Sequence, residues 1–180
     1  RHVERMDPSY EAIFTAEEIA RQAALAGQLD ADTLVQVDAA ALDEGRWRVT
    51  VVAYDFPGEL AAICGMMFVH GLEIEDGNVF TYEPEQHGKA SAPRKIVDVF
   101  TVRPVAGALD PETWALDRAH LSDLLHRLKA GRREEARADL ARRAAEAVRG
   151  KAAAPTTLYP VDIDFDNHSS PRYTVLHISG

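Results

Sequence analysis

The sequence has a single cysteine, Cys64, so no disulfide bond can form within the chain. Cys64 lies on the apolar face of an expected helix, which is typical of a small core residue. No apolar run approaches the roughly 20 residues that a membrane-spanning helix needs, and no signal peptide is recognisable. We therefore expect a cytoplasmic protein that makes no use of the membrane or of an oxidising compartment.

An excess of positive charge is also missing. The chain has 20 Lys and Arg against 29 Asp and Glu, a net charge of −9, whereas a nucleic-acid surface needs a basic stripe. The apolar content of 46% over 180 residues is enough for a packed core. Because the chain begins with Arg1 and ends within an extended run, we expect it to be a piece of a longer protein.

The central segment predicts strand, turn, helix, strand, loop and strand. Arg46–Tyr54 is rich in Val and aromatic residues, as in a buried strand. The turn Asp55–Gly58 ends it, because Pro57 and Gly58 have backbone angles that neither strand nor helix propagates. A helix follows over Glu59–His70, and Gly71 ends it. Its expected core face consists of Leu60, Ile63, Cys64, Met67 and Phe68.

Two further strands are predicted, over Leu72–Tyr82 and Lys95–Arg103. In the first strand, the alternation of apolar and polar residues shifts by one position near Asp76-Gly77, which predicts a β-bulge there. The polar segment Glu83–Arg94 between the strands is expected to form a long hairpin loop. If both strands are straight, that loop lies at the end of the sheet away from Asp55–Gly58, and shortening it leaves ligand binding there unchanged.

The flanking segments are mostly helical. Thr15 and Glu18 form a capping-box pattern that starts a helix running to about Leu29. Leu34–Leu42 is either a short strand or a loop. Asp110-Pro111 predicts the start of a helix to Lys129, with Leu121, Leu124, Leu125 and Leu128 facing the core.

A second helix is expected over Arg132–Arg149. Its apolar stripe is narrow, so we expect it to pack weakly or to span solvent. Its arginines alternate with Glu and Asp, which favours ion pairs along a solvated face over an anion site. Leu158–Phe165 and Arg172–Ile178 read as strands.

The turn Asp55–Gly58 is the best candidate for a binding site. Glycine at the start of a helix lets a ligand approach the backbone, and the free amides of Glu59 to Ala61 carry partial positive charge. An amino-acid carboxylate suits that geometry, and Asp55 is placed to bind the α-amino group. The alternative is a turn that only links strand to helix.

Three patterns together resemble an ACT domain, the small βαββαβ regulatory module that senses amino acids. They are Asp55-x-Pro57-Gly58-x-Leu60, Gly71-Leu72-x-Ile74 and Asp98-x-Phe100-x-Val102. Within the family the chain is most similar to the C-terminal ACT region of the bacterial PII uridylyltransferase/uridylyl-removing enzymes. Two flanking segments, 1–29 and 174–178, support the closer similarity.

The resemblance implies an α+β fold: an ACT-like (ferredoxin-like) antiparallel sheet with helices on one face, an N-terminal helix and a helical extension. The expected domains are a linker and helix over 1–44, an ACT-like domain over 45–165 with a helical insertion at 110–150, and the start of a second ACT unit over 166–180. The fourth strand of the sheet is expected at Leu158–Phe165. Exposed sheet edges of ACT units pair with another unit, which implies a homodimer.

The resemblance also implies a small amino-acid ligand, with glutamine as the expected one. The ligand lies between the turn and the second strand of a neighbouring ACT unit. The expected ligand-binding residues are Asp55, Phe56, Gly58, Glu59, Leu60, Ile74, Glu75, Asp76 and Asn78. Glu59 departs from the family, which more often has Leu there, and its charge would repel a carboxylate if it faced the pocket.

No catalytic residue, cofactor or metal is expected. His120 and His126 lie six residues apart, on nearly opposite sides of one helix, and no third ligand completes a metal cluster. The parent enzyme type would need a nucleotidyltransferase motif and a His-Asp hydrolase motif, and the sequence contains neither. Three classes compete: a ligand-sensing regulatory domain, a dimerisation or interaction module that binds no ligand, and a free-standing enzyme, which the missing motifs disfavour.

Overall fold

The computed structural model describes residues 2–83, 93–149, 162–166 and 175–179, and it divides the chain into two compact units, 1–149 and 150–180. The second unit contains a two-stranded antiparallel sheet of β5 (Asp162–Asp166) and β6 (Val175–Ser179). The first unit contains η1 (Val3–Arg5), α1 (Tyr10–Ile13), α2 (Ala16–Gly27), β1 (Val35–Ala41), η2 (Asp43–Gly45), β2 (Trp47–Tyr54), α3 (Glu59–Val69), β3 (Leu72–Thr81), β4 (Lys95–Pro104), α4 (Thr113–Lys129) and α5 (Arg133–Val148).

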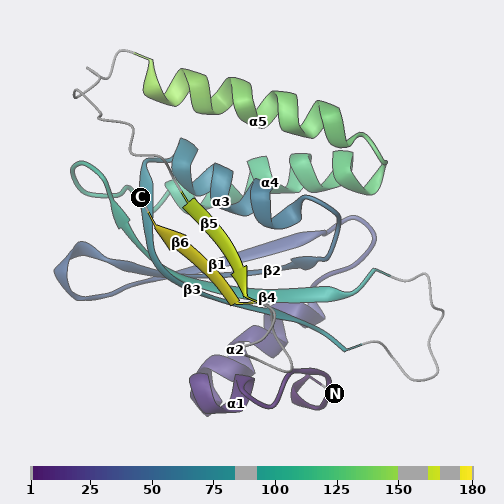
Figure 1. Ribbon diagram of the computed structural model, residues 1–180. Helices are drawn as coiled ribbons and strands as arrows, with labels where there is room; N and C mark the ends of the chain where they lie inside the picture. The colour runs from purple at the N-terminus through teal and green to yellow at the C-terminus, as the bar shows by residue number, and fades with distance from the viewer. Residues whose placement is uncertain (1, 84–92, 150–161, 167–174, 180) are drawn as a thin grey trace. The chain divides into compact units, whose positions relative to one another are not determined.

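The first unit is built on a four-stranded antiparallel sheet with the order β1-β2-β4-β3 (Figure 1). The two central strands are β2 and β4, and α3 connects β2 to β3 across them. This arrangement confirms the predicted α+β, ferredoxin-like architecture. It also confirms the order of strand, helix, strand and strand that the central segment predicts.

The fourth strand of this sheet is β1, and the expectation of Leu158–Phe165 was wrong. β1 pairs with β2 from Val35↔Ala53 to Ala41↔Trp47, as a hairpin closed by η2. That turn contains two positive φ values, 62° at Glu44 and 73° at Gly45. The alanines at 39–41 weaken the apolar alternation that marks a strand, which explains the ambiguity of this segment in the sequence. The described part of the other segment, 162–165, belongs to β5 and pairs with β6.

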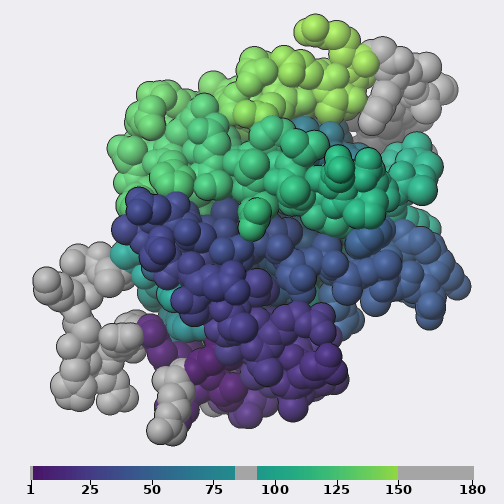
Figure 2. All heavy atoms as spheres, turned by 180° about the vertical axis from the view of Figure 1, so that it is seen from behind, coloured from purple at the N-terminus to yellow at the C-terminus, as the bar shows by residue number. Residues whose placement is uncertain are grey.

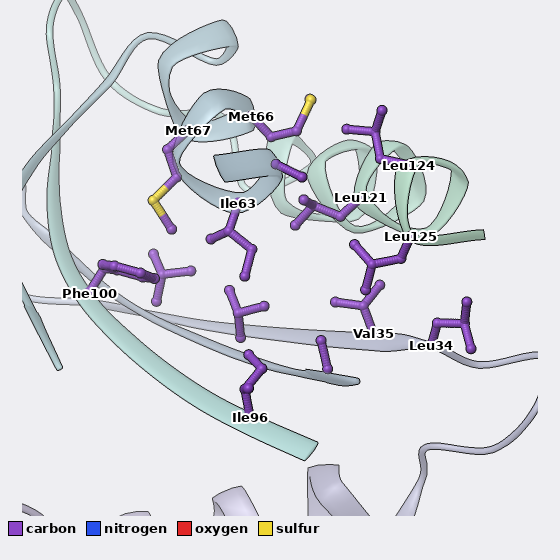
Figure 3. Close-up of a cluster of buried hydrophobic side chains, with 14 of the residues drawn as sticks. Leu34, Val35, Ile63, Met66, Met67, Ile96, Phe100, Leu121, Leu124 and Leu125 are labelled. Atoms are coloured by element: carbon purple, nitrogen blue, oxygen red, sulfur yellow. The ribbon is translucent and has the colours of Figure 1, made fainter. Parts of the chain in front are cut away.

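The main core lies between the sheet and the pair α3 and α4. Figure 3 shows side chains of both helices directed at the sheet, with Ile63 above Ile96 and Phe100. The leucine stripe predicted for α4 is confirmed, since Leu121, Leu124, Leu125 and Leu128 are all buried. The helix starts at Thr113, three residues after the predicted N-cap Asp110, whose carboxylate accepts from the Glu112 amide at 2.9 Å.

The buried side of α3 differs from the predicted face. Ile63 and Met67 are buried as expected, but Leu60 and Phe68 are 42% and 53% exposed. Ala62 and Met66 are buried in their place, because α3 contacts α4 and α5 as well as the sheet. A helix that is apolar on nearly every side gives no periodic signal for which side faces the core.

The N-terminal segment covers the opposite face of the sheet (Figures 1 and 2). The predicted capping box of α2 is present, with Thr15 Oγ1 accepting from the Glu18 amide and Glu18 accepting from the Thr15 amide. Buried Tyr10 and Phe14 contact Phe80 of β3 edge-to-face. The sheet is therefore covered on both faces, with Val52, Val97 and Val99 beneath the N-terminal helices.

α5 forms an outer layer on α3 and α4 (Figure 1). Its contacts are made by buried Ala136 and half-buried Leu140, while most of the helix is exposed. A Cβ at Gly65 of α3 would lie 2.6 Å from Leu140 Cδ2, so glycine at that position allows the close approach of the two helices. The predicted ion pairs along α5 are present, among them Arg142 and Arg143 with Asp139.

The predicted β-bulge is confirmed close to its expected place, since the pairing of β3 with β4 shifts register between Ile74 and Asp76. Gly77 has a separate reason to be glycine: a Cβ there would lie 2.8 Å from the ring of its cross-strand partner Phe100. In the part of the chain that the structure describes, no helix has both the length and the apolarity needed to cross a bilayer.

Candidate functional site

The turn Asp55–Gly58 leads directly into α3 without a side-chain cap. Gly58 is the N-cap residue, with φ 98° and ψ 3°, a left-handed conformation that favours glycine. The Glu59 amide donates to the Phe56 carbonyl at 2.9 Å, and the Ala62 amide donates to the Gly58 carbonyl at 3.1 Å. The amides of Leu60 and Ala61, in the first turn of α3, are therefore the groups open to an outside acceptor.

Asp55 is fixed by the start of β4. Its carboxylate forms an ion pair with Arg94 at 3.0 Å, and its amide donates to the Arg94 carbonyl at 2.8 Å. Arg94, the last residue of segment 83–94, therefore lies beside the turn, and the expectation that this segment lies at the far end of the sheet was wrong there; residues 84–92 lie outside the described residues. β2 and β4 are antiparallel with Tyr54 opposite Lys95, so the end of β2 and the start of β4 lie at the same end.

Glu59 does not face a ligand approaching the turn, because its side chain is buried. It is 6% exposed, and burial together with nearby Asp55 raises its pKa to about 7. Asp98 of β4 is completely buried on the helix side of the sheet, and among the described residues no side chain neutralises its carboxylate by an ion pair. Burial and the charge of Glu59 raise the Asp98 pKa to about 8. The burial of Glu59 and its raised pKa reduce the repulsion of a ligand carboxylate that the sequence implied.

A cavity of about 290 Å³ opens beside Gly58, between α3, α4 and α5. Its walls are mainly apolar, and two arginines from the first two turns of α5, Arg133 and Arg137, also line it. The remaining lining residues are Gly58, Ala61, Ala62, Leu124, Leu128, Ala136 and Leu140. Of the nine residues predicted to bind a ligand, Gly58 alone lines this cavity.

The predicted β3 part of the site, Ile74, Glu75, Asp76 and Asn78, lies elsewhere in the unit. β4 separates β3 from β2 in the sheet, and β3 is an edge strand. Ile74 is 37% exposed, and Glu75 forms an ion pair with Arg103 at 3.2 Å. Within one chain, the structure does not bring this segment to the cavity beside Gly58.

The contribution of α5 to the surroundings of the turn was not predicted from the sequence. The apolar stripes of α4 and α5 were visible in the sequence, but nothing in their spacing shows that α5 packs against the first turn of α3. The one available signal was Arg133, which has no acidic residue four positions away to pair with.

A second polar cluster lies at the other end of α3. His70 Nε2 is 3.6 Å from Oδ1 of completely buried Asp117, and the His70 ring stacks on His120. Burial raises the pKa of Asp117 to about 7 and lowers the pKa of both histidines. Among the described residues, no three His, Cys, Asp or Glu side chains converge as a metal site.

Comparison with known proteins gives one distant relative. No family model matches the chain. The chain is 29% identical, over 184 aligned positions, to the bifunctional uridylyltransferase/uridylyl-removing enzyme of Azospirillum brasilense. The alignment includes the whole chain but only 18% of that enzyme, so the chain corresponds to a minor part of the relative's length.

Proposed function

We propose that this chain is an amino-acid-sensing ACT region that regulates a nitrogen-metabolism enzyme of the uridylyltransferase/uridylyl-removing type. The similarity over the whole chain supports the enzyme type. The observation that carries the sensing role is the uncapped first turn of α3, which starts at left-handed Gly58 beside a cavity. Because the chain matches a minor part of its relative, we assign the catalytic steps to the remainder of such an enzyme, in the cytoplasm.

The proposed ligand is a small amino acid, with glutamine as the first candidate. Its carboxylate accepts from the amides of Leu60 and Ala61, where the helix dipole favours negative charge. Its α-amino group binds Asp55, in competition with Arg94. Ile74, Glu75, Asp76 and Asn78 of a neighbouring unit, together with Phe56, complete the proposed site.

A thermal-shift screen against the twenty amino acids tests this proposal. A ligand that binds only the folded state stabilises it by RT ln(1 + [L]/Kd), so a true ligand at about 100 Kd adds roughly 2.7 kcal/mol. We expect a clear rise in melting temperature with glutamine or with one or two related amino acids. Equal melting temperatures with all twenty would contradict sensing.

The second candidate function is a dimerisation or interaction module that binds no ligand. It is favoured by the exposed apolar side chains beside the β3 edge: Leu60 and Phe68 on α3, and Ile74 and Val79 on β3. Edge strands of this length pair readily with another chain. A dimer that responds to none of the amino acids would favour this function over sensing.

A further inference from the structure

The cavity between α3, α4 and α5 has an unusual distribution of charge. Arg133 lies over the N-terminal turn of α3, and a Cβ built at Gly58 would be 3.6 Å from its Nε. A cation at that place faces the positive end of the helix dipole, which is unfavourable. Among the described residues, the Arg133 side chain has no hydrogen bond and no ion pair, whereas its neighbour Arg132 pairs with Glu135 at 3.2 Å.

The charge of Arg137, the second arginine that lines the cavity, is only weakly neutralised. Arg137 is 3.5 Å from Glu134, and both side chains are largely exposed, at 70% and 84%. Exposed pairs of this kind contribute little. Among the residues that the structure describes, no Asp or Glu lines the cavity. Two arginines and the first turn of α3 thus border a cavity in which no described acidic side chain balances their positive charge.

The other residues that line the cavity indicate the size and polarity of the part of the ligand that does not contact the arginines. Leu124, Leu128 and Leu140 with three alanines form an apolar surface, and about 290 Å³ is at the small end of ligand pockets. An inorganic anion would leave that surface unfilled. A carboxylate joined to a short aliphatic chain satisfies both the guanidinium groups and the walls.

We propose that this cavity is a binding site for a small aliphatic carboxylate, held by Arg133 and Arg137 of α5. The site lies within one chain and needs no neighbouring unit. The cavity adjoins the proposed sensing turn at Gly58 and Ala61, but its arginines would bind a carboxylate with or without an amino group. Binding would also fasten α5 to α3, because the ligand contacts both helices.

The test is an NMR titration of the full 180-residue chain, observing the arginine Nε–Hε signals. The probe is 4-methylpentanoate, and the matched uncharged control is 4-methylpentanamide. We expect saturable shifts of the Arg133 and Arg137 signals with the acid and at least tenfold weaker binding of the amide, since hydrogen bonds to charged groups are among the strong ones. Equal binding of acid and amide, or no shift at millimolar acid, would overturn the proposal.

Two variants and one further probe complete the experiment. Arg133→Gln should weaken binding of the acid at least tenfold, whereas Arg132→Gln, one residue away and outside the cavity, should leave it unchanged. Ala61→Phe should block the cavity from an exposed position without disturbing the core. Binding that survives both Arg133→Gln and Ala61→Phe would place the acid elsewhere and refute the site. Leucine differs from 4-methylpentanoate only in its amino group. If leucine binds more tightly than 4-methylpentanoate at the same arginines, the cavity is the amino-acid site. If 4-methylpentanoate binds more tightly, the cavity is a second site, separate from the amino-acid site.

Discussion

Glu59 and Asp98 make the stability of the fold depend on pH. Their pKa values of about 7 and about 8 lie above the ordinary values of 4.5 and 3.8 for these groups. Between about pH 4 and pH 8 the folded chain therefore holds protons that the unfolded chain has released. The free energy of unfolding is highest on the acidic side of this window and falls as the pH rises through it.

Asp98→Asn should remove most of this pH dependence. The amide has the same shape but no charge, so the variant gains stability relative to the wild type as the pH rises. Between pH 5 and pH 8.5 the gain should grow by about 1–3 kcal/mol, as measured by urea unfolding. Asp43→Asn, at an exposed position in η2, serves as the control. Parallel pH profiles for Asp98→Asn and the wild type would show that Asp98 is not buried as a neutral acid.

Gly58 tests the geometry of the turn. An alanine there must adopt a φ near 98°, so Gly58→Ala should lower the free energy of unfolding by about 1–2 kcal/mol. Gly27→Ala, at the end of α2 with no atom within 4 Å of the added Cβ, should be neutral or slightly stabilising. Gly58→Val should in addition abolish amino-acid binding. An equal effect of the two alanine substitutions would contradict the left-handed turn.

At the residue scale, helix caps and turns could be predicted from the sequence, whereas the burial of individual acidic side chains could not. The capping box of Thr15 and Glu18 and the turn at Gly58 follow from rules that involve four residues or fewer. The burial of Glu59 and Asp98 depends on which side of α3 and of β4 faces the core. Single acidic residues in apolar surroundings do not reveal that side, and the sequence left open whether the charge of Glu59 faces the pocket.

At the scale of elements, the contact between α3 and α5 is the feature with the most consequences. Gly65→Ala brings a Cβ to 2.6 Å from Leu140 Cδ2, so Leu140 must shift, which offsets the gain of about 1 kcal/mol in helix propensity. In a Leu140→Ala background that gain is unopposed. A double-mutant cycle by urea unfolding should give a coupling of about 0.5–1 kcal/mol. Additivity within about 0.3 kcal/mol would show that α5 does not pack on α3 at Gly65.

The extents of β2, α3, β3 and β4 were predictable to within a few residues. Which strands pair with one another was harder to predict. The hairpin of β1 and β2 was missed because three consecutive alanines hide the alternation of β1. The position of Arg94 was misjudged although it follows from antiparallel pairing, since a strand that starts beside Tyr54 brings Arg94 to Asp55. Both cases depend on which strands become neighbours, which periodicity within a strand does not encode.

At the scale of the whole molecule, the edge strand β3 predicts association. Among the described strands β3 pairs with β4 alone, and Phe68 and Val79 beside this edge are 53% and 50% exposed. We expect sedimentation velocity to show a dimer at high micromolar concentration and a monomer for the double variant Phe68→Asp, Val79→Lys. Leu116→Asp, at an equally exposed apolar position on α4, should remain dimeric. A monomeric wild type at that concentration would contradict the expected association.

The sensing role is tested most directly by a titration of the 15N-labelled chain with glutamine and with the amino acids that stabilise it. We expect saturable shifts of the Leu60 and Ala61 amide signals, with smaller shifts at the end of α3 near His70. Loss of these shifts in Gly58→Val, with the rest of the spectrum unchanged, would show that binding requires the turn at Gly58. An amino acid that binds without moving either amide signal, or the absence of any saturable shift across all twenty, would contradict the proposed function.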